Sequence, residues 1–257
     1  GRFVWPRSID LDNTGRVFVS DEHVNRITIF DEEGAYRYHW GRSGSEDGQL
    51  NGPSGIAFDS HGTIWVVDSL NHRVQSFSQI GEFQSKFGKQ GAGDGDLEMP
   101  WGICVDRQDN IYVADWGNNR VQKFAPNGEL LVKFECSSTG VGSLKGPSGV
   151  AVDSDGDVYV TDWGNHRVQI YAADGRYITA LVGDAQELSP WAQAYIDANP
   201  DIIKARRRAD LEPEWRFRRP VAINVDADDR IIILESHRHR LQIYNKLKDY
   251  EEHSLNL

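Results

Sequence analysis

The sequence has little sulfur and no long apolar segment, and each absence excludes a class of protein. Its 257 residues include two cysteines, Cys104 and Cys136, and one methionine. Two cysteines do not make a disulfide framework, so we interpret them as free thiols, which slightly favours a reducing, cytoplasmic compartment. No apolar run approaches the ~18 residues of a membrane-spanning helix. The first residue is glycine rather than methionine, so the start of the sequence assigns no compartment.

Positive charge is also scarce. The formal net charge is −11, although the 26% content of charged residues is ordinary for a globular protein. An acidic chain is unsuited to coating nucleic acid or anionic membranes through its overall field. Only a local basic segment could serve such a function.

What the sequence does contain is a repeat. Pro6, Pro53, Pro100 and Pro147 are each 47 residues apart, and Pro220 follows after 73 residues. Aspartate or glutamate and then arginine recur in the same register, at positions given below. Three markers in one register over five copies establish an internal repeat and an extra segment of 26 residues before the last copy.

Each repeat unit predicts four short strands. In the second copy these are residues 55–59, 63–68, 73–77 and 82–88, which are rich in Val, Ile and aromatic residues and separated by Gly, Asp, Asn and Ser. Short antiparallel strands with a period of about 40–50 residues are typical of propeller blades. The third strand ends in a large ring (Phe30, Phe77, Phe124, Tyr171 or Tyr244), which suits packing between neighbouring blades.

These residues carry a specific resemblance. The pattern Pro-x-Gly-[Ile/Val]-x-x-Asp, followed by Asp-x-x-Asn-[His/Asn]-Arg-Val-Gln-x-[Phe/Tyr], resembles the NHL repeat, as found in bacterial stand-alone NHL repeat proteins. The resemblance covers nearly the whole chain apart from the extra segment. It implies an all-β propeller of four-stranded antiparallel blades. The outer copies depart from the pattern, because Val24 and Arg238 replace the asparagine and Glu235 replaces the aspartate.

The resemblance predicts one propeller domain over residues 1–257. Its repeats cover about 1–47, 48–94, 95–141, 142–183 and 214–257, with residues 248–255 as the last fourth strand and a helical insert over 184–213. Proteins of this family usually close six blades, whereas five repeats are visible. Either five blades close on themselves, or an N-terminal blade lies outside these residues; the family norm favours the second.

The repeated loop between strands two and three has two interpretations, a ligand site or a structural hairpin. Catalytic sites are usually built once, whereas this loop recurs in every blade, so we predict a structural role. The aspartate and arginine should pair across the hairpin, contributing about 0.2–1 kcal/mol if exposed. The structural repeat residues are Asp21, Arg26, Asp68, Asn71, Arg73, Asp115, Asn118, Arg120, Asp162, Asn165, Arg167, Glu235 and Arg240.

Repeated histidines and aspartates suggest two possible metal sites, but a structural role is favoured for both sets of residues. His72, His166 and His239 share one repeat position, and related propeller lyases hold a metal on histidines near the axis, yet these three lie on separate blades. On the opposite face an aspartate recurs, and residues 153–157 (DSDGD) resemble the start of a calcium loop without its closing glutamate. We interpret these aspartates as caps of tight hairpins and predict no cofactor and no catalytic residue.

If repeated residues build the scaffold, departures from the repeat should carry the function. Trp116 and Trp163 follow the loop aspartate only in the third and fourth repeats, and Met99 and Trp101 flank the third anchoring proline. By alternation of the connections, these residues and the insert share one face. Clustered surface aromatics are typical anchors of protein interfaces.

The insert is the basic exception. A helix is expected from Ser189 and Pro190, with Trp191, Ala194 and Tyr195 on one stripe, and a second over residues 200–210. Arg206, Arg207 and Arg208 precede Trp215 within it. Three interpretations stay open: a helical hairpin folded over the propeller, a protein-binding site, or a site for single-stranded RNA.

The sequence therefore favours a soluble, non-catalytic interaction scaffold, a subunit or accessory protein of a larger assembly. Its expected partner-binding residues are Trp116, Trp163, Trp101, Met99, Trp191, Arg206, Arg207, Arg208 and Trp215. The alternatives are a metal-dependent lyase or hydrolase with a site at the axis, and RNA binding through the insert.

Overall fold

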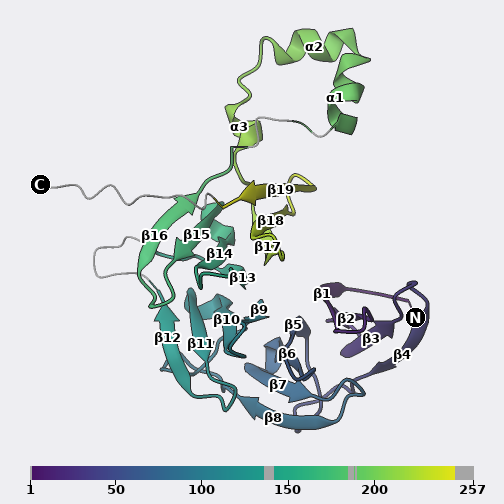
Figure 1. Ribbon diagram of the computed structural model, residues 1–257, viewed down its shortest axis with the longest axis vertical. Helices are drawn as coiled ribbons and strands as arrows, with labels where there is room; N and C mark the ends of the chain where they lie inside the picture. The colour runs from purple at the N-terminus through teal and green to yellow at the C-terminus, as the bar shows by residue number, and fades with distance from the viewer. Residues whose placement is uncertain (1, 136–141, 185–187, 189, 247–257) are drawn as a thin grey trace, which may run out of the picture.

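The computed structural model describes residues 2–135, 142–184, 188 and 190–246 of the chain (Figure 1). It is an all-β propeller of five blades with a few helices, so the five repeats are five blades and not the six of the family norm. The blades follow one another around an axis. The strands β1, β5, β9, β13 and β17 lie innermost, and β4, β8, β12 and β16 lie outermost.

Each blade is an antiparallel sheet whose strands pair in chain order. The first two blades consist of β1 (Pro6–Leu11), β2 (Val17–Asp21), β3 (Arg26–Phe30), β4 (Tyr36–Trp40), β5 (Pro53–Phe58), β6 (Ile64–Asp68), β7 (Arg73–Phe77) and β8 (Phe83–Phe87). The third and fourth consist of β9 (Ile103–Val105), β10 (Ile111–Asp115), β11 (Arg120–Phe124), β12 (Leu130–Phe134), β13 (Pro147–Val152), β14 (Val158–Asp162), β15 (Arg167–Tyr171) and β16 (Tyr177–Leu181).

The fifth blade has three described strands, β17 (Pro220–Val225), β18 (Arg230–Glu235) and β19 (Arg240–Asn245). Its expected fourth strand, residues 248–255, lies outside the described residues. Between β16 and β17 the chain forms α1 (Pro190–Asp197), α2 (Pro200–Arg206) and α3 (Glu212–Trp215). The expected cap Ser189 is likewise outside the described part. Among the described residues, no helix is long and apolar enough to cross a membrane.

The hydrophobic core lies between blades. The aromatic residue that ends the third strand packs on a ring from the fourth strand of the preceding blade. The ring centroids are 5.0 Å apart for Trp40 and Phe77 and 4.6 Å apart for Phe87 and Phe124. Since each blade buries one face against each neighbour, stability accumulates along the array rather than in one central core.

Small residues at the start of the inner strands let these strands crowd around the axis. A Cβ atom at Gly102 would come within 2.6 Å of the carbonyl oxygen of Ser148, and one at Gly55 within 2.7 Å of that of Trp101. Only glycine fits these two positions without a shift of neighbouring backbone. The glycines near the anchoring prolines are thus explained by packing.

Candidate partner-binding face

The repeated loop begins directly after β6, β10 and β14 with a short 3-10 turn. The turns are Ser69–Asn71, Trp116–Asn118 and Trp163–Asn165. Each ends at a residue with left-handed backbone, for example His72 at φ 55° and Asn119 at φ 54°. Asparagine and histidine adopt this conformation more readily than most residues, which accounts for their place in the repeat.

A buried hydrogen-bond network fastens this loop to its own blade. The carboxylate of Asp68 accepts from the backbone N–H of Asn51 at 2.6 Å, from the side chains of Asn71 and Arg73 at 2.8 Å each, and from Gln75 at 3.0 Å. Asp68 is fully buried. Burial raises the pKa of this carboxyl, while the N–H of Asn51 opposes that rise.

The arginine of the loop extends the network to the linker that enters the blade. Arg73 donates to the carbonyl oxygens of Glu46 and Gln49 at 2.9 and 3.0 Å. The carboxylates of Asp115 and Asp162 are held in the same way by linker N–H groups and by their own arginines. The expected pairing across the hairpin is present in the second to fifth blades, and because these carboxylates are buried the range for an exposed pair does not apply. In the first blade Arg26 instead donates to the carbonyl oxygen of Arg2.

The imidazoles at the next loop position join consecutive blades. The Nδ1 atom of His72 accepts from the backbone N–H of Met99 at 3.1 Å, and that of His166 from Arg219 at 3.2 Å. Asn119 plays the same role with its side-chain oxygen, which accepts from Gly146 at 2.8 Å. Within the described residues, no group of three His, Cys, Asp or Glu side chains could hold a metal ion.

The aspartates on the opposite face cap their hairpins. Asp59 accepts from the N–H of His61 at 3.0 Å and of Thr63 at 2.8 Å, and the equivalent residues repeat the pattern. In the DSDGD segment the carboxylates of residues 153, 155 and 157 all accept from the ammonium group of Lys246, at 2.7 to 2.9 Å. A lysine ammonium group thus lies among the three carboxylates of the segment that resembles a calcium loop.

The non-repeating residues form an aromatic and arginine cluster on the face of the loops and linkers. The rings of Trp101 and Trp116 pack edge to face with centroids 5.8 Å apart. The guanidinium carbon of Arg7 lies 5.1 Å from the centroid of Trp101 and 5.5 Å from that of Trp5. Arg7 also pairs with Glu22. This aromatic cluster, made of Trp5, Arg7, Trp101 and Trp116, joins the first blade to the third.

Sequence reasoning missed Arg7 as part of this cluster. Its position directly after the anchoring proline is the one at which Trp101 departs from the repeat, so the signal was present in the alignment of the copies. What the sequence could not supply is the curvature that brings the first and third blades together.

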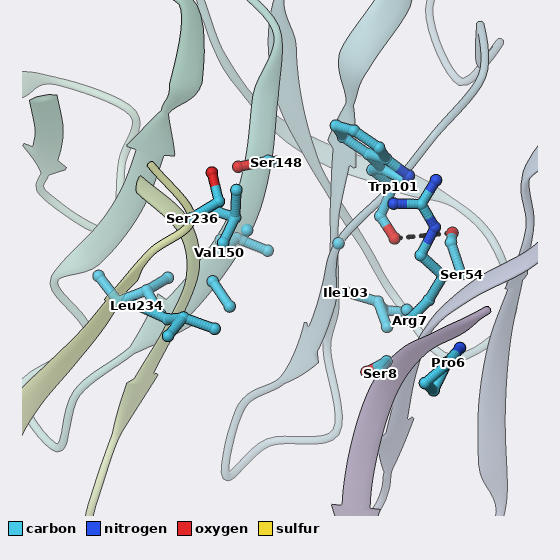
Figure 2. A pocket seen from close by; sticks show the side chains of 16 residues that line it. Pro6, Arg7, Ser8, Ser54, Trp101, Ile103, Ser148, Val150, Leu234 and Ser236 are labelled. Atoms are coloured by element: carbon cyan, nitrogen blue, oxygen red, sulfur yellow. Dashed lines mark hydrogen bonds between the residues drawn. The ribbon is translucent and has the colours of Figure 1, made fainter. Parts of the chain in front are cut away.

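Beside the cluster lies a cavity of about 350 Å³ at the axis (Figure 2). Arg7 and Trp101 line one side of it, and Ser148, Leu234 and Ser236 line the other. The hydroxyl of Ser54 donates to the carbonyl oxygen of Trp101 at 2.9 Å. The cavity therefore combines one cation, hydroxyl groups and apolar walls, and it opens beside the aromatic cluster.

The remaining predicted residues are not all brought together. Trp163 is separate from the cluster and packs under the guanidinium of Arg219, 4.6 Å from its carbon. Met99 is half-exposed. Trp116 and Trp163 each cover the linker of the following blade; a Cβ atom at Gly146 would meet the indole nitrogen of Trp116 at 2.7 Å.

Two arginines of the helical segment form ion pairs with glutamates of the same segment. Arg206 pairs with Glu214 at 2.8 Å and Arg216 with Glu212 at 2.6 Å, whereas Arg207 and Arg208 are exposed. Trp191 stacks on Tyr195, and no residue of α1 or α2 is buried. Figure 1 shows these two helices projecting beyond the blades rather than folded over them. Trp215 sits at the base of the segment, where its carbonyl oxygen accepts from Arg240 at 3.4 Å.

Two family models match the chain, between residues 9 and 171. The model of the NHL repeat matches residues 144–171, and that of the SMP-30/Gluconolactonase/LRE-like region matches residues 9–144, more than half of the sequence. The chain belongs to the SMP-30/Gluconolactonase/LRE-like family, and it is an NHL-type β-propeller with a matched NHL repeat at residues 144–171. Cys104 is a free thiol in this propeller, as expected, and Cys136 lies outside the described residues. The cytoplasmic location inferred from the thiols has no further support.

Solved structures share the fold of this propeller at low sequence identity. A catalytically inactive virginiamycin B lyase from Staphylococcus aureus with quinupristin has a TM-score of 0.60 and 14% identity, covering 94% of this chain and 70% of the lyase. The nidogen/laminin complex has a TM-score of 0.58 and 17% identity, and the match covers 94% of this chain and 80% of that chain. A streptogramin B lyase structure has a TM-score of 0.58 and 14% identity, and the match covers 94% of this chain and 68% of the lyase. No curated protein matches the chain significantly.

Proposed function

We propose that this NHL-type propeller is a non-catalytic protein-interaction scaffold, a subunit or accessory protein of a larger assembly. Its contact surface is the face that carries the loops between second and third strands and the base of the helical segment. The observation that supports this most is the aromatic cluster, in which an arginine lies between two tryptophans and a third tryptophan packs on one of them.

The chemistry of the cluster suits a protein partner. Tryptophan and arginine dominate interface hot spots because they combine large apolar area with directional polar groups. Trp5 is 57% exposed, and Met99 beside the loops is 40% exposed. The indole nitrogen of Trp116 is buried, so the exposed parts of the cluster would make the contact. Trp163, Trp191, Trp215 and Arg206 to Arg208 extend the proposed surface toward the helices.

Repeated residues leave little room for an alternative site on this face. The aspartates, asparagines and arginines of the loops are engaged in the network that fastens loop, linker and blade. The same network recurs in the third and fourth blades. Function is therefore assigned to the departures from the repeat.

A second candidate is a metal-dependent lyase or hydrolase with a site at the axis. The axial cavity favours it, because a space of about 350 Å³ lined by Arg7 and serine hydroxyls has room for a small polar substrate. Zinc or calcium in stoichiometric amount, lost when His72 and His166 are substituted, would favour this candidate over the scaffold.

A third candidate is binding of single-stranded RNA by the helical segment. Arg207 and Arg208 are exposed beside the stacked pair of Trp191 and Tyr195. Arginines and stacked aromatic rings suit unpaired bases. Salt-sensitive retention of RNA that disappears when Arg207 and Arg208 are replaced by alanine would support it.

The scaffold is tested by capture of interacting proteins with wild type and with a Trp101→Ala/Trp116→Ala variant. The matched control is Leu131→Ala/Ile178→Ala, which removes two exposed apolar side chains from the outer strands β12 and β16. We expect the tryptophan variant to lose its partners and the control to retain them. If both variants recover the same proteins as wild type, the proposed surface is wrong.

A further inference from the structure

A basic patch lies where the fourth and fifth blades meet on the face of the loops. Its side chains come from the loop between β14 and β15, the linker that enters the fifth blade, and the loop between β18 and β19. The patch consists of His166, Arg218, Arg219, His237 and His239. Four of these residues are exposed, and Arg219 is half-buried. Such a concentration of basic groups contrasts with the formal net charge of the chain, which is −11.

Hydrogen bonds from the linker hold the three segments of the patch together. The N–H of Arg219 donates to Nδ1 of His166 at 3.2 Å. The carbonyl oxygen of Arg219 accepts from the N–H and from the hydroxyl of Ser236, at 3.2 Å each. The N–H of Arg218 donates to the carboxylate of Glu235 at 2.6 Å. The linker therefore ties the loop of the fourth blade to that of the fifth and brings their basic side chains together.

The basic groups of the patch are close enough to act on one another. The pKa of His237 is lowered, first by desolvation and then by four basic neighbours. These neighbours are Arg218, Arg219, His166 and His239. Basic groups held this close repel one another when they are charged, and a bound anion relieves that repulsion.

The two arginines of the patch form no ion pair with a carboxylate in the part of the chain that the structure describes. Nearby arginines do form such pairs. Arg216 pairs with Glu212 at 2.6 Å. Arg240 pairs with Glu235, whose carboxylate is fully buried. The guanidinium groups of the patch are thus available to a carboxylate from another molecule.

Arg219 also occupies a backbone position that suits glycine. The residue before the anchoring proline has a left-handed backbone in four blades, and in the second and fourth it is Gly52 at φ 64° and Gly146 at φ 59°. Arg219 adopts φ 55°. A residue with a bulky side chain is strained in this conformation, so the repeat does not account for an arginine here. A function of its guanidinium group would account for it.

Trp163 orients this guanidinium group. The guanidinium carbon of Arg219 lies 4.6 Å from the centroid of the Trp163 ring. An arginine that stacks on an aromatic ring can still donate two parallel hydrogen bonds to a carboxylate from its N–H edge. The covered face of the ring is not available to an unpaired base, which favours a carboxylate ligand over RNA.

We propose that the basic patch binds an acidic peptide segment of a protein partner through aspartate or glutamate side chains. This inference rests on the proposed scaffold function and names the chemistry of the partner. Arg218 and Arg219 supply charge-assisted hydrogen bonds to the carboxylates. A short acidic segment fits the patch better than a long polyanion does, because the acidic chain repels negative charges that extend beyond the patch.

The test measures the binding of a short fluorescent peptide of alternating aspartate and glycine to the full chain. Fluorescence anisotropy is recorded at about 50 mM salt, where charges are weakly screened. The comparison probes are the same peptide with asparagine in place of aspartate, and an oligouridylate of the same length. We expect only the acidic peptide to bind, with an affinity that falls as salt is added.

The variant Arg218→Gln/Arg219→Gly separates ligand binding from the fold, because glycine is the residue that two other blades use before the proline. It should weaken binding of the acidic peptide at least about tenfold. It should not lower the midpoint of urea denaturation, since glycine relieves the left-handed strain. The control Arg37→Gln/Arg107→Gln removes two exposed arginines elsewhere and should change the affinity less than about twofold.

Several results would overturn the proposal. One is equal binding of the acidic and the asparagine peptide, and another is wild-type affinity in Arg218→Gln/Arg219→Gly. Binding of oligouridylate in preference to the acidic peptide would assign the patch to RNA. Capture of proteins by the Trp101 and Trp116 surface without any peptide binding would refute the patch and leave the scaffold standing. Peptide binding without such capture would support the patch and refute the proposed scaffold surface.

Discussion

Asp115 offers the most direct test of the buried network. Its carboxylate accepts from the backbone N–H of Glu98 at 2.7 Å and from the side chains of Asn118, Arg120 and Gln122 at 2.9, 2.8 and 3.3 Å. In Asp115→Asn, one oxygen becomes an NH₂ group that faces these donors. The charge that neutralises the buried guanidinium of Arg120 disappears as well.

The magnitude follows from the burial of both partners. The side chain of Asp115 is fully buried and that of Arg120 is 6% exposed. Breaking a buried ion pair by removing one partner costs about 3–5 kcal/mol, because the other charge is left without compensation. That loss is a large fraction of the total stability of a typical domain.

The assay is urea denaturation followed by circular dichroism and by tryptophan fluorescence, with Asp94→Asn as the control. Asp94 pairs with Lys133 at 2.9 Å, but its side chain is 70% exposed. We expect a midpoint far below that of wild type for Asp115→Asn and no measurable shift for Asp94→Asn. Equal effects of the two substitutions would refute the reasoning that the repeated loop is a buried fastening.

Three further predictions concern single side chains. His72→Asn should keep the stability of wild type, since asparagine makes the same contact in other blades. His72→Leu should lower the free energy of unfolding, measured by urea denaturation, by about 1 kcal/mol. Burial raises the pKa of the Cys104 thiol, which keeps it protonated at pH 8, so in a Cys136→Ser variant a disulfide reagent should react much more slowly with the folded protein than with the urea-unfolded chain; equal rates would contradict this. The N–H of Arg230 lowers the pKa of Asp226, so its contribution to stability is present above pH ~4 and is lost as the pH falls through the folded pKa; Asp226→Asn should flatten that acid-side decline.

Much of the fold could be predicted because the same pattern of strands and turns recurs in five copies. The period of 47 residues fixed the blades, and the alternation of loops placed the tryptophans and linkers on one face. The roles of Asp68 and Arg73 followed from their recurrence. Their burial did not, because the linker atoms of Asn51 and Gln49 that enclose them come from a turn whose path the sequence does not specify.

The candidate site was harder to predict for a geometric reason. Trp101 and Trp116 were singled out by their departure from the repeat, and they do lie in contact. Trp163 was grouped with them because its blade is adjacent, yet it packs on Arg219 instead. Arg7 reaches the cluster from the first blade across the axis, a contact that depends on how sharply the blades turn.

The measurement that tests the central assignment most directly is the metal content of the purified protein. If the loop residues are fastenings, zinc and calcium should stay far below one equivalent per chain. His72→Asn should then fold and bind partners like wild type. One equivalent of metal per chain, lost in His72→Asn, would contradict the scaffold and move the function to the axis.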